Sequence, residues 1–280
     1  MTVGIGVLCE DARCIILASD TRASHGNRSP NDVCSKIFDL LPFELSCCIA
    51  GTISRATSVG LQICSQLGEI PTSLAKRAAI MAAIDEGRFN IHEELINVRM
   101  LKEMSTSLER WRVGPLDPYL YRDGKRIICT TSLGIQLIVG GFLRGEPILL
   151  RTIGVEPMEE EFSPGVFLVG TGKAVDAAHA VLAHRKQCVQ FGFARTLFHV
   201  HEALEAAKNA APTFVGGAVT YLIRTQNTSK ELPATSDLLA RWSGGKKYKK
   251  STIGLEEESV REEVGTHLIT HSPMLLTSQR

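Results

Sequence analysis

The sequence predicts an α+β fold in which antiparallel sheets are layered against paired helices. Three observations lead to this prediction. Apolar runs rich in β-branched residues come in pairs with short polar connections, as in β-hairpins. Helical periodicity appears in two separate stretches, each long enough for two helices. The order is strands, two helices, strands, two helices and a final strand, which favours a layered sandwich over simple βαβ alternation.

The chain begins with a predicted hairpin. The apolar runs 2–9 and 13–20 are rich in Val, Ile and Leu, and Glu10-Asp11-Ala12 separates them. Two such runs with a short polar connection are typical of paired antiparallel strands. A further short run, 45–51, predicts a strand that ends in Ala50-Gly51.

Two helices are predicted next, over 52–67 and roughly 86–112, because apolar residues recur there at helical spacing. Thr52 or Ser54 is a suitable cap for the first helix. Gly114-Pro115 is expected to end the second.

The second half of the chain repeats the order of strands followed by helices. Runs 134–142 and 147–153 flank Arg144-Gly145-Glu146 and predict another hairpin. A short buried strand is expected over 166–170. Two Ala-rich helices, about 172–187 and 193–210, and a last strand, 217–224, complete the pattern.

One domain is predicted over residues 1–225, followed by a tail over 226–280. The periodic pattern weakens after Thr225, and 241–265 hold Gly-Gly, a cluster of Lys and a cluster of Glu. This composition predicts a tail that is partly flexible or docked on a partner.

Composition and charge exclude several function classes. Hydrophobic residues make up 44% of the chain and charged residues 22%, which is typical of a globular protein. A formal net charge of +1 provides no basic field for nucleic acid or an anionic membrane. No apolar run approaches the ~20 residues of a membrane-spanning helix. We therefore expect neither a nucleic-acid nor a membrane partner.

The eight cysteines do not indicate a metal site. None forms a Cys-x-x-Cys pair, and several sit inside apolar runs, where cysteine behaves as a small hydrophobe. The N-terminus lacks the pattern of a secretory signal. We therefore expect reduced thiols, a cytoplasmic location, and no metal or other cofactor.

The first residue after Met1 is Thr2, and the first apolar run follows at once. An alcohol needs a neighbouring base to act as a nucleophile at neutral pH, and an N-terminal Thr has its own α-amine. That amine is free only after removal of Met1, which the small Thr2 side chain favours. A nearby Lys would lower the pKa of the amine from about 7.7–8.0, and a carboxylate would hold that Lys in a partly buried site.

Four features of this sequence are considered together, in chain order: Thr2, Asp20-Thr21-Arg22, Lys36-Ile37-Phe38 and Ala50-Gly51. Together they resemble the catalytic β-subunits of the proteasome and their bacterial ring-peptidase relatives, which are N-terminal-nucleophile (Ntn) hydrolases. The resemblance covers roughly residues 2–224 and depends on order and spacing. It implies a four-layer αββα sandwich and a threonine-type endopeptidase of a ring homo-oligomer. The substrate would be a peptide or an unfolded protein, and an unfoldase partner is compatible with it.

The resemblance also implies a role for each matched residue. Thr2 would be the nucleophile, Lys36 would tune its amine and hydroxyl, and Asp20 would hold Lys36. The Gly51 N–H would stabilise the oxyanion, and Thr171 would replace a Ser of a second polar cluster. The pocket beside Thr2 would be lined by Ala23, Cys34, Ile49 and Ile53, which predicts an uncharged, apolar side chain before the cleaved bond.

The sequence departs from the family pattern at the second polar cluster. Pro212 and Val215 stand where the family has an Asp and a Ser. This departure favours a non-catalytic ring subunit as one alternative. A second alternative is an Ntn amidohydrolase that acts on a small amide.

Overall fold

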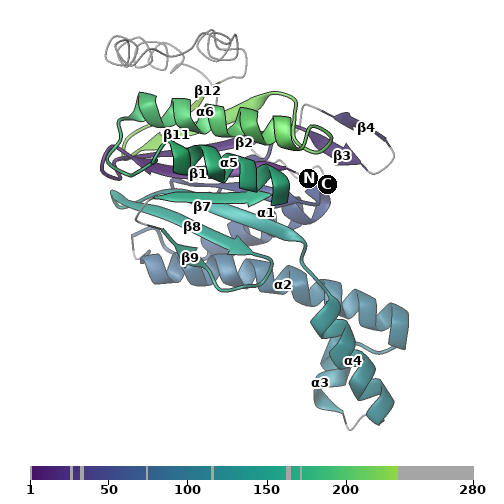
Figure 1. The fold of residues 1–280 in the computed structure, drawn as a ribbon. Coiled ribbons are helices and arrows are strands. Elements are labelled where there is room, and N and C mark those ends of the chain that lie inside the picture. The colour runs from purple at the N-terminus through teal and green to yellow at the C-terminus, as the bar shows by residue number, and fades with distance from the viewer. Residues whose placement is uncertain are drawn as a thin grey trace.

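A computed structural model describes residues 2–25, 28–31, 35–73, 75–114, 117–161, 165–170 and 172–232. Within these residues the chain forms two five-stranded sheets, a two-stranded ribbon and six helices. Every strand pair is antiparallel, as the predicted hairpins required. Figure 1 shows that each five-stranded sheet is accompanied by a pair of helices.

The first sheet is built around the N-terminal hairpin. Both of its strands are buried along their whole length, because the sheet is covered on both faces. The connecting residues Glu10, Asp11 and Ala12 all have positive φ angles, which allows the tight reversal. The sheet order is β10 (Val166–Gly170), β1 (Val3–Cys9), β2 (Cys14–Asp20), β11 (Val219–Thr225) and β12 (Ser229–Leu232).

The second sheet is built from the middle of the chain. Its order is β5 (Ile37–Asp39), β6 (Leu45–Gly51), β7 (Ile135–Leu143), β8 (Glu146–Ile153) and β9 (Glu159–Glu160). The short ribbon of β3 (Ala23–His25) and β4 (Arg28–Asn31) lies outside both sheets.

Two helix pairs cover the outer faces of the two sheets (Figure 1). Helices α5 (Gly172–His184) and α6 (Phe193–Ala210) share a buried apolar core with β1, β2, β10 and β11. Helices α1 (Ile53–Gly68) and α2 (Arg77–Met104) share another with β6, β7 and β8. Alternation of side chains along the strands separates these cores from a third one, which lies between the sheets.

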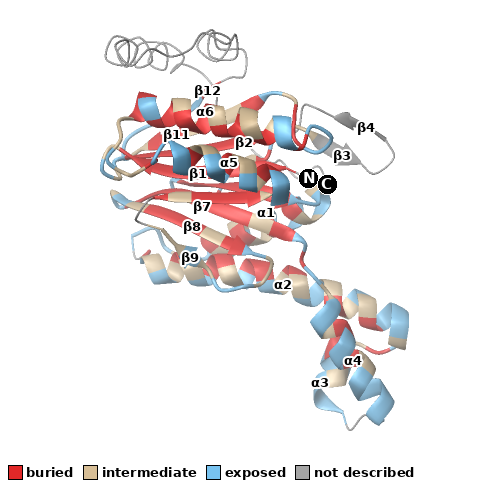
Figure 2. Cartoon of the chain, viewed as in Figure 1, coloured by how far each residue is buried: buried red, intermediate tan, exposed pale blue. Residues whose placement is uncertain are grey.

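The inter-sheet core brings the two sheets into contact. Leu17 and Leu8 from the first sheet meet Ile138 and Phe142 from the second. Close approach requires small residues: a Cβ placed on Gly6 would lie 2.6 Å from the Ile138 side chain. The continuous buried band through both sheets is red in Figure 2.

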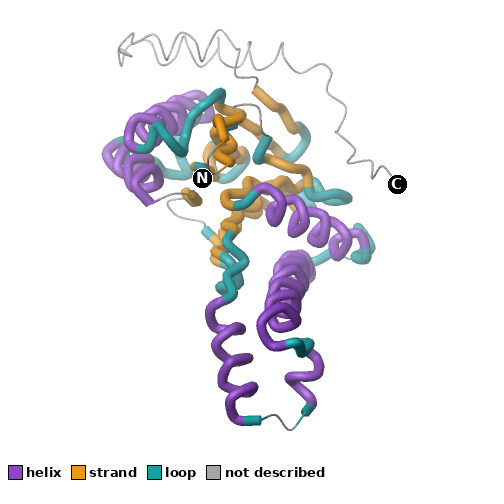
Figure 3. The backbone as a smooth tube through the Cα atoms, turned by 90° about the vertical axis from the view of Figure 1, so that its right-hand side faces the viewer, coloured by secondary structure: helices purple, strands orange, loops and turns teal. Residues whose placement is uncertain are grey.

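The predicted helix over 86–112 is wrong in its bounds. The structure has one long helix, α2, and then a separate short helix, α3 (Leu108–Val113). The break occurs at Ser105, which takes a left-handed conformation with φ of 54°. A further helix that the sequence reading did not predict, α4 (Pro118–Thr130), follows α3. The end of α2 together with α3 and α4 projects from the body of the molecule (Figure 3).

The remaining elements lie close to their predicted bounds. The strands predicted over 45–51 and 166–170 have those bounds, and the two later helices begin as predicted. Strand β12 lies beyond the predicted domain end at 225 and extends the first sheet to Leu232. Residues 233–280, most of the predicted tail, lie outside the described residues. Among the described helices, none has the length and apolarity needed to cross a membrane.

Candidate active site

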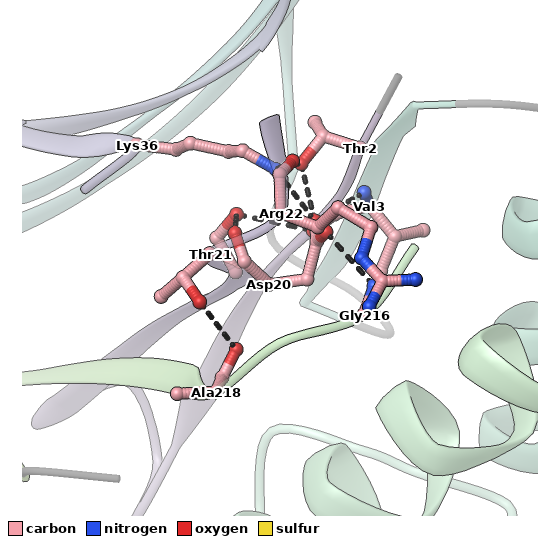
Figure 4. Close-up of polar contacts among 9 residues, drawn as sticks. Thr2, Val3, Asp20, Thr21, Arg22, Lys36, Gly216 and Ala218 are labelled. Carbon is pink, nitrogen blue, oxygen red and sulfur yellow. Dashed lines mark hydrogen bonds and ion pairs between the residues drawn. The ribbon is translucent and has the colours of Figure 1, made fainter. Parts of the chain in front are cut away.

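Thr2 lies directly before β1, where β1 runs between β2 and β10. Thr2 is buried, with 3% of its surface exposed. The Thr2 hydroxyl donates to Asp20 Oδ1, and the following backbone N–H, of Val3, donates to the same oxygen at 3.0 Å. The carboxylate at the end of β2 therefore fixes both the side chain and the backbone at the start of β1 (Figure 4).

Lys36 reaches the same point from the second sheet, because it immediately precedes β5. Its ammonium group donates to the Thr2 hydroxyl, to Asp20 Oδ1 at 3.0 Å and to the Arg22 carbonyl at 2.6 Å. A Lys ammonium has three N–H donors, so it can donate to all three of these acceptors at once. The three predicted residues Thr2, Asp20 and Lys36 thus form one hydrogen-bonded cluster, which we call the threonine cluster (Figure 4).

Burial makes this cluster electrostatically strong. Asp20 is 1% exposed and Lys36 7% exposed. Removing both charges from water is costly, and it is tolerated only when the ions are paired and otherwise hydrogen-bonded. Each ion here has its partner and additional polar contacts. The arrangement places a cation beside the Thr2 hydroxyl in a region of low water content, which would stabilise negative charge on that oxygen.

Three contacts from the residues before β11 reach Asp20 and its neighbour Arg22, and the sequence did not predict them. The Gly216 N–H donates to Asp20 Oδ2 at 3.3 Å. The Arg22 guanidinium donates to the Pro212 carbonyl at 2.7 Å, and the Arg22 N–H donates to the Gly216 carbonyl at 3.2 Å. The turn that contains Pro212 is therefore bound to the threonine cluster through main-chain atoms. A main-chain donor has no side-chain signature in a sequence, which explains why it was missed.

Cys48 lies on β6, close enough to Ser19 and Lys36 for both to affect its thiol. A Cβ placed on Gly4 would lie 2.5 Å from its sulfur, so the thiol packs against the β1 backbone. Burial raises the pKa of the Cys48 thiol to about 12, although Ser19 and Lys36 act in the opposite direction. The thiolate, not the thiol, is the reactive form. Cys48 is therefore a packing group.

Gly51 ends β6 with a φ of +136°, a conformation that favours glycine. A Cβ at this position would lie 2.4 Å from the Gly134 carbonyl oxygen. The backbone of Gly51 is thus fixed against the neighbouring strand, in which Ile135 is its register partner. This geometry explains why the strand ends in Gly.

The other predicted site residues have different surroundings. Ile49 is buried in the core shared with α1 and α2, and Ile53 begins α1 in a half-buried position. Ala23 begins β3, and its side chain is outside the described part of the chain. Cys34 and Thr171 lie outside the described residues, as does Met1. Among the described residues no group of His, Cys, Asp and Glu could hold a metal ion.

Comparison with known proteins gives a structural match only. No protein-family model matches the sequence, and no curated protein matches it. Two solved structures of Anbu from Hyphomicrobium sp. strain MC1 match over 97% of this chain and 99% of theirs. The first, a Gly-1 mutant, has a TM-score of 0.60, and the second a TM-score of 0.58; both are 13% identical in sequence.

Anbu is a bacterial proteasome-like protein of the Ntn-hydrolase type. At 13% identity the match concerns the fold. The chain therefore has a mixed α and β architecture, with two antiparallel sheets, similar to that of Anbu.

Proposed function

We propose that this chain is a threonine-type peptidase subunit of a proteasome-like ring, with Thr2 as its nucleophile. The observation that carries the proposal is the threonine cluster, in which a buried Lys–Asp pair contacts the Thr2 hydroxyl. Lys36 and Asp20 contact each other directly and need no hydroxyl for a structural ion pair. The Thr2 hydroxyl nevertheless contacts both ions, and a charged group beside a hydroxyl is one way to activate it as a nucleophile. The Anbu-like fold supports the ring assembly.

In this proposal the layered sheets and helices are the four-layer αββα sandwich of Ntn hydrolases. The packing of α5 and α6 on one sheet and of α1 and α2 on the other supports it. The Thr2 end of β1 would then open to substrate once Met1 is gone.

The reaction would be an acyl transfer. Removal of Met1 frees the Thr2 amine, since in the chain with Met1 this nitrogen belongs to a peptide bond. The Thr2 oxygen attacks a peptide carbonyl, the amine takes the hydroxyl proton and then gives a proton to the leaving amine. Water releases the acyl group. Lys36 stabilises the negative charge that develops on the Thr2 oxygen, and Asp20 holds Lys36 in place.

The tetrahedral intermediate needs a donor for its oxyanion. We assign the Gly51 N–H to this role; loss of one such donor costs about 2.7–4 kcal/mol in other enzymes. Thr171 would supply the hydroxyl of the second polar cluster. Pro212 and Val215 do not provide the polar side chains that the family has at these positions. The Gly216 N–H, which donates to Asp20, would supply part of the missing hydrogen bonding.

Substrate preference would follow from the apolar side chains Ala23, Cys34, Ile49 and Ile53. These residues favour an uncharged, apolar side chain before the cleaved bond. Profiling with a peptide library tests this, and strong cleavage after acidic or basic residues would contradict it.

The first test is the intact mass of the purified protein after incubation with a peptide epoxyketone, a reagent that needs both the free amine and the hydroxyl. A chain that lacks Met1 and carries one inhibitor, with labelling lost in Thr2→Ala, is the expected result. A chain that lacks Met1 and stays unlabelled would contradict the peptidase proposal.

That second result would favour a non-catalytic ring subunit. Val215, in place of a polar residue, is 1% exposed and belongs to the apolar core below α6. This position therefore provides no polar side chain near Thr2. Sedimentation velocity of the unlabelled chain would then show a ring without activity.

A further inference from the structure

Gln136 is the polar residue of an otherwise apolar strand. Strand β7 reads IQLIVGGFL. Leu137 and Val139 pack into the core with α1 and α2, whereas Ile138 and Phe142 pack between the sheets. Side chains alternate along a strand, so Gln136 shares the inter-sheet face with Ile138. An amide on this face needs a hydrogen-bond partner from the opposite sheet.

That partner is the backbone of Gly170, the last residue of β10. The Gly170 N–H donates to Gln136 Oε1 at 2.6 Å, and Gln136 Nε2 is 3.5 Å from the Gly170 carbonyl oxygen. The first contact is short and well within hydrogen-bond range, whereas the second is at its limit. One side chain from the second sheet thus fixes one peptide of the first.

Gly170 in turn lies against Thr2. Its register partner is Val3, and its φ is +135°. A Cβ placed on Gly170 would lie 2.0 Å from the Thr2 carbonyl oxygen. The two backbones are therefore in direct contact, and a shift of Gly170 would be transmitted to Thr2.

The other side of Gln136 leads to the assigned oxyanion donor. Gln136 is the register partner of Ala50, and the next pair in the ladder joins Ile135 to Gly51. Gln136 therefore stands between the strand end that carries Gly51 and the backbone that contacts Thr2. No charge is involved, so the effect of Gln136 on Thr2 would be geometric.

We propose that Gln136 is a positioning residue, which holds Thr2 at a fixed separation from Gly51 through the Gly170 backbone. The inference rests on the proposed function and adds a residue to it. A misplacement of reacting groups by about 1 Å can cost 10²-fold in rate, so one hydrogen bond between the sheets is sufficient for a measurable effect.

The test measures the rate of Thr2 acylation by a peptide epoxyketone over a range of inhibitor concentrations, which separates the maximal rate kinact from the affinity KI. Gln136→Met keeps the side-chain length and removes the acceptor. We expect kinact to fall roughly 10–100-fold with little change in KI. Gln136→Glu keeps the acceptor for the Gly170 N–H and should stay within about threefold of the wild-type kinact.

Gln226→Met is the matched control. Gln226 likewise hydrogen-bonds to a backbone group at 2.6 Å, as donor to the Gly145 carbonyl, but it does so at the opposite end of β7. Its substitution should leave kinact unchanged. A uniform loss of stability would lower the yield of active protein in both Met variants, whereas a positioning role lowers kinact in Gln136→Met alone.

Each outcome has a separate meaning. If the wild-type chain is labelled and Gln136→Met has the same kinact, the positioning role is overturned and the proposed function is unaffected. An unlabelled wild-type chain that lacks Met1 would overturn the proposed function, and the role with it. If Gln136→Met does not fold, Gln136→Asn replaces it. Its amide is one methylene too short to reach Gly170, so an unchanged kinact there would also overturn the role.

Discussion

Two buried polar clusters in this protein differ in charge: one contains an ion pair and the other is neutral. The threonine cluster contains a Lys–Asp ion pair at the junction of the two sheets. The second, which we call the helix cluster, lies where α6 packs on the first sheet and near the end of α5. It consists of two separate hydrogen-bonded groups that both include residues of α6: Gln187, Thr196 and His199 form one, and His201 and Tyr221 form the other.

The helix cluster is neutral at neutral pH. His199 Nδ1 donates to Gln187 Oε1 at 2.7 Å, and Gln187 Nε2 donates to the Thr196 hydroxyl at 3.1 Å. Burial, together with the charges of Arg195 and Arg185, lowers the pKa of His199 to about 4. Burial also lowers the pKa of His201. Both imidazoles are therefore uncharged.

The difference between the clusters lies in the partners that the fold supplies. Lys36 has a buried carboxylate at 3.0 Å, which offsets the desolvation of its charge. His199 has only an amide oxygen as its partner. Two nearby guanidinium groups, those of Arg195 and Arg185, disfavour a positive charge on its ring. A site for acid–base chemistry needs a charged group held by an opposite charge, as Lys36 is. A neutral imidazole with an amide partner, as at His199, is sufficient for packing.

The largest expected effect comes from breaking the charge pair. Lys36→Met leaves Asp20 buried without its cation, which should cost about 3–5 kcal/mol of stability and abolish epoxyketone labelling. Chemical denaturation and intact mass measure the two effects.

The double variant Lys36→Met/Asp20→Asn separates stability from chemistry. Removing both charges should recover most of the lost free energy of unfolding, because no unpaired ion remains. Labelling should stay absent. A single Lys36→Met variant that is labelled at the wild-type rate would show that the cation has no part in the chemistry.

A second, smaller effect tests the backbone of the threonine cluster without changing any charge. Gly170→Ala places a Cβ 2.0 Å from the Thr2 carbonyl oxygen at a φ of +135°, so we expect a cost of about 2–4 kcal/mol. The control is Gly60→Ala in α1, where a Cβ meets nothing within 4 Å. That change should stabilise the helix by roughly 0.5–1 kcal/mol. Equal effects on the two unfolding midpoints would contradict the close packing at Gly170.

The contrast also shows which parts of the fold a sequence reveals. The strands over 45–51 and 166–170 were predicted with their bounds, because each is a short apolar run closed by Gly. The break in the long helix was not, since Ser105 takes its left-handed conformation without Gly or Pro. Helix α4 did have a start signal: Asp117 caps it and Pro118 is its first residue. No helix was predicted here, because only Gly124 and Ile127 are buried in it and its apolar periodicity is correspondingly weak.

In the candidate site, too, some contacts could be predicted from the sequence and others could not. The spacing of Thr2, Asp20 and Lys36 predicted a group of neighbours, and hydrogen bonds join them. Their catalytic roles stay predictions. The contributions of Gly216 and Gln136 could not be predicted, because each depends on a main-chain N–H whose partner only the tertiary structure defines.

A third prediction concerns pH and affects the helix cluster. His199 has a folded-state pKa of about 4 and an unfolded value near 6.5, so the unfolded chain binds more protons between these values. The contribution of this residue to stability should be constant above about pH 7 and should fall by about 3 kcal/mol as pH drops from 6.5 to 4. His199→Gln should have a shallower decline over this range in urea unfolding. Parallel pH profiles for the two proteins would contradict a neutral, buried His199.

The smallest expected effect tests whether the helix cluster is independent of the threonine cluster. Tyr221→Phe removes the hydroxyl that shares a 2.8 Å hydrogen bond with His201 Nδ1. Because Tyr221 is fully buried, the loss should cost about 1 kcal/mol of stability. Tyr119→Phe, at a residue that is 69% exposed, should cost nothing measurable. Neither change should alter the rate of Thr2 labelling, because Tyr221 lies in the core below α6 and its hydroxyl contacts His201, which is not a member of the threonine cluster. A reduced labelling rate in Tyr221→Phe would mean that the two clusters are coupled through β2, which is the neighbour of β11 and carries Asp20 at its end.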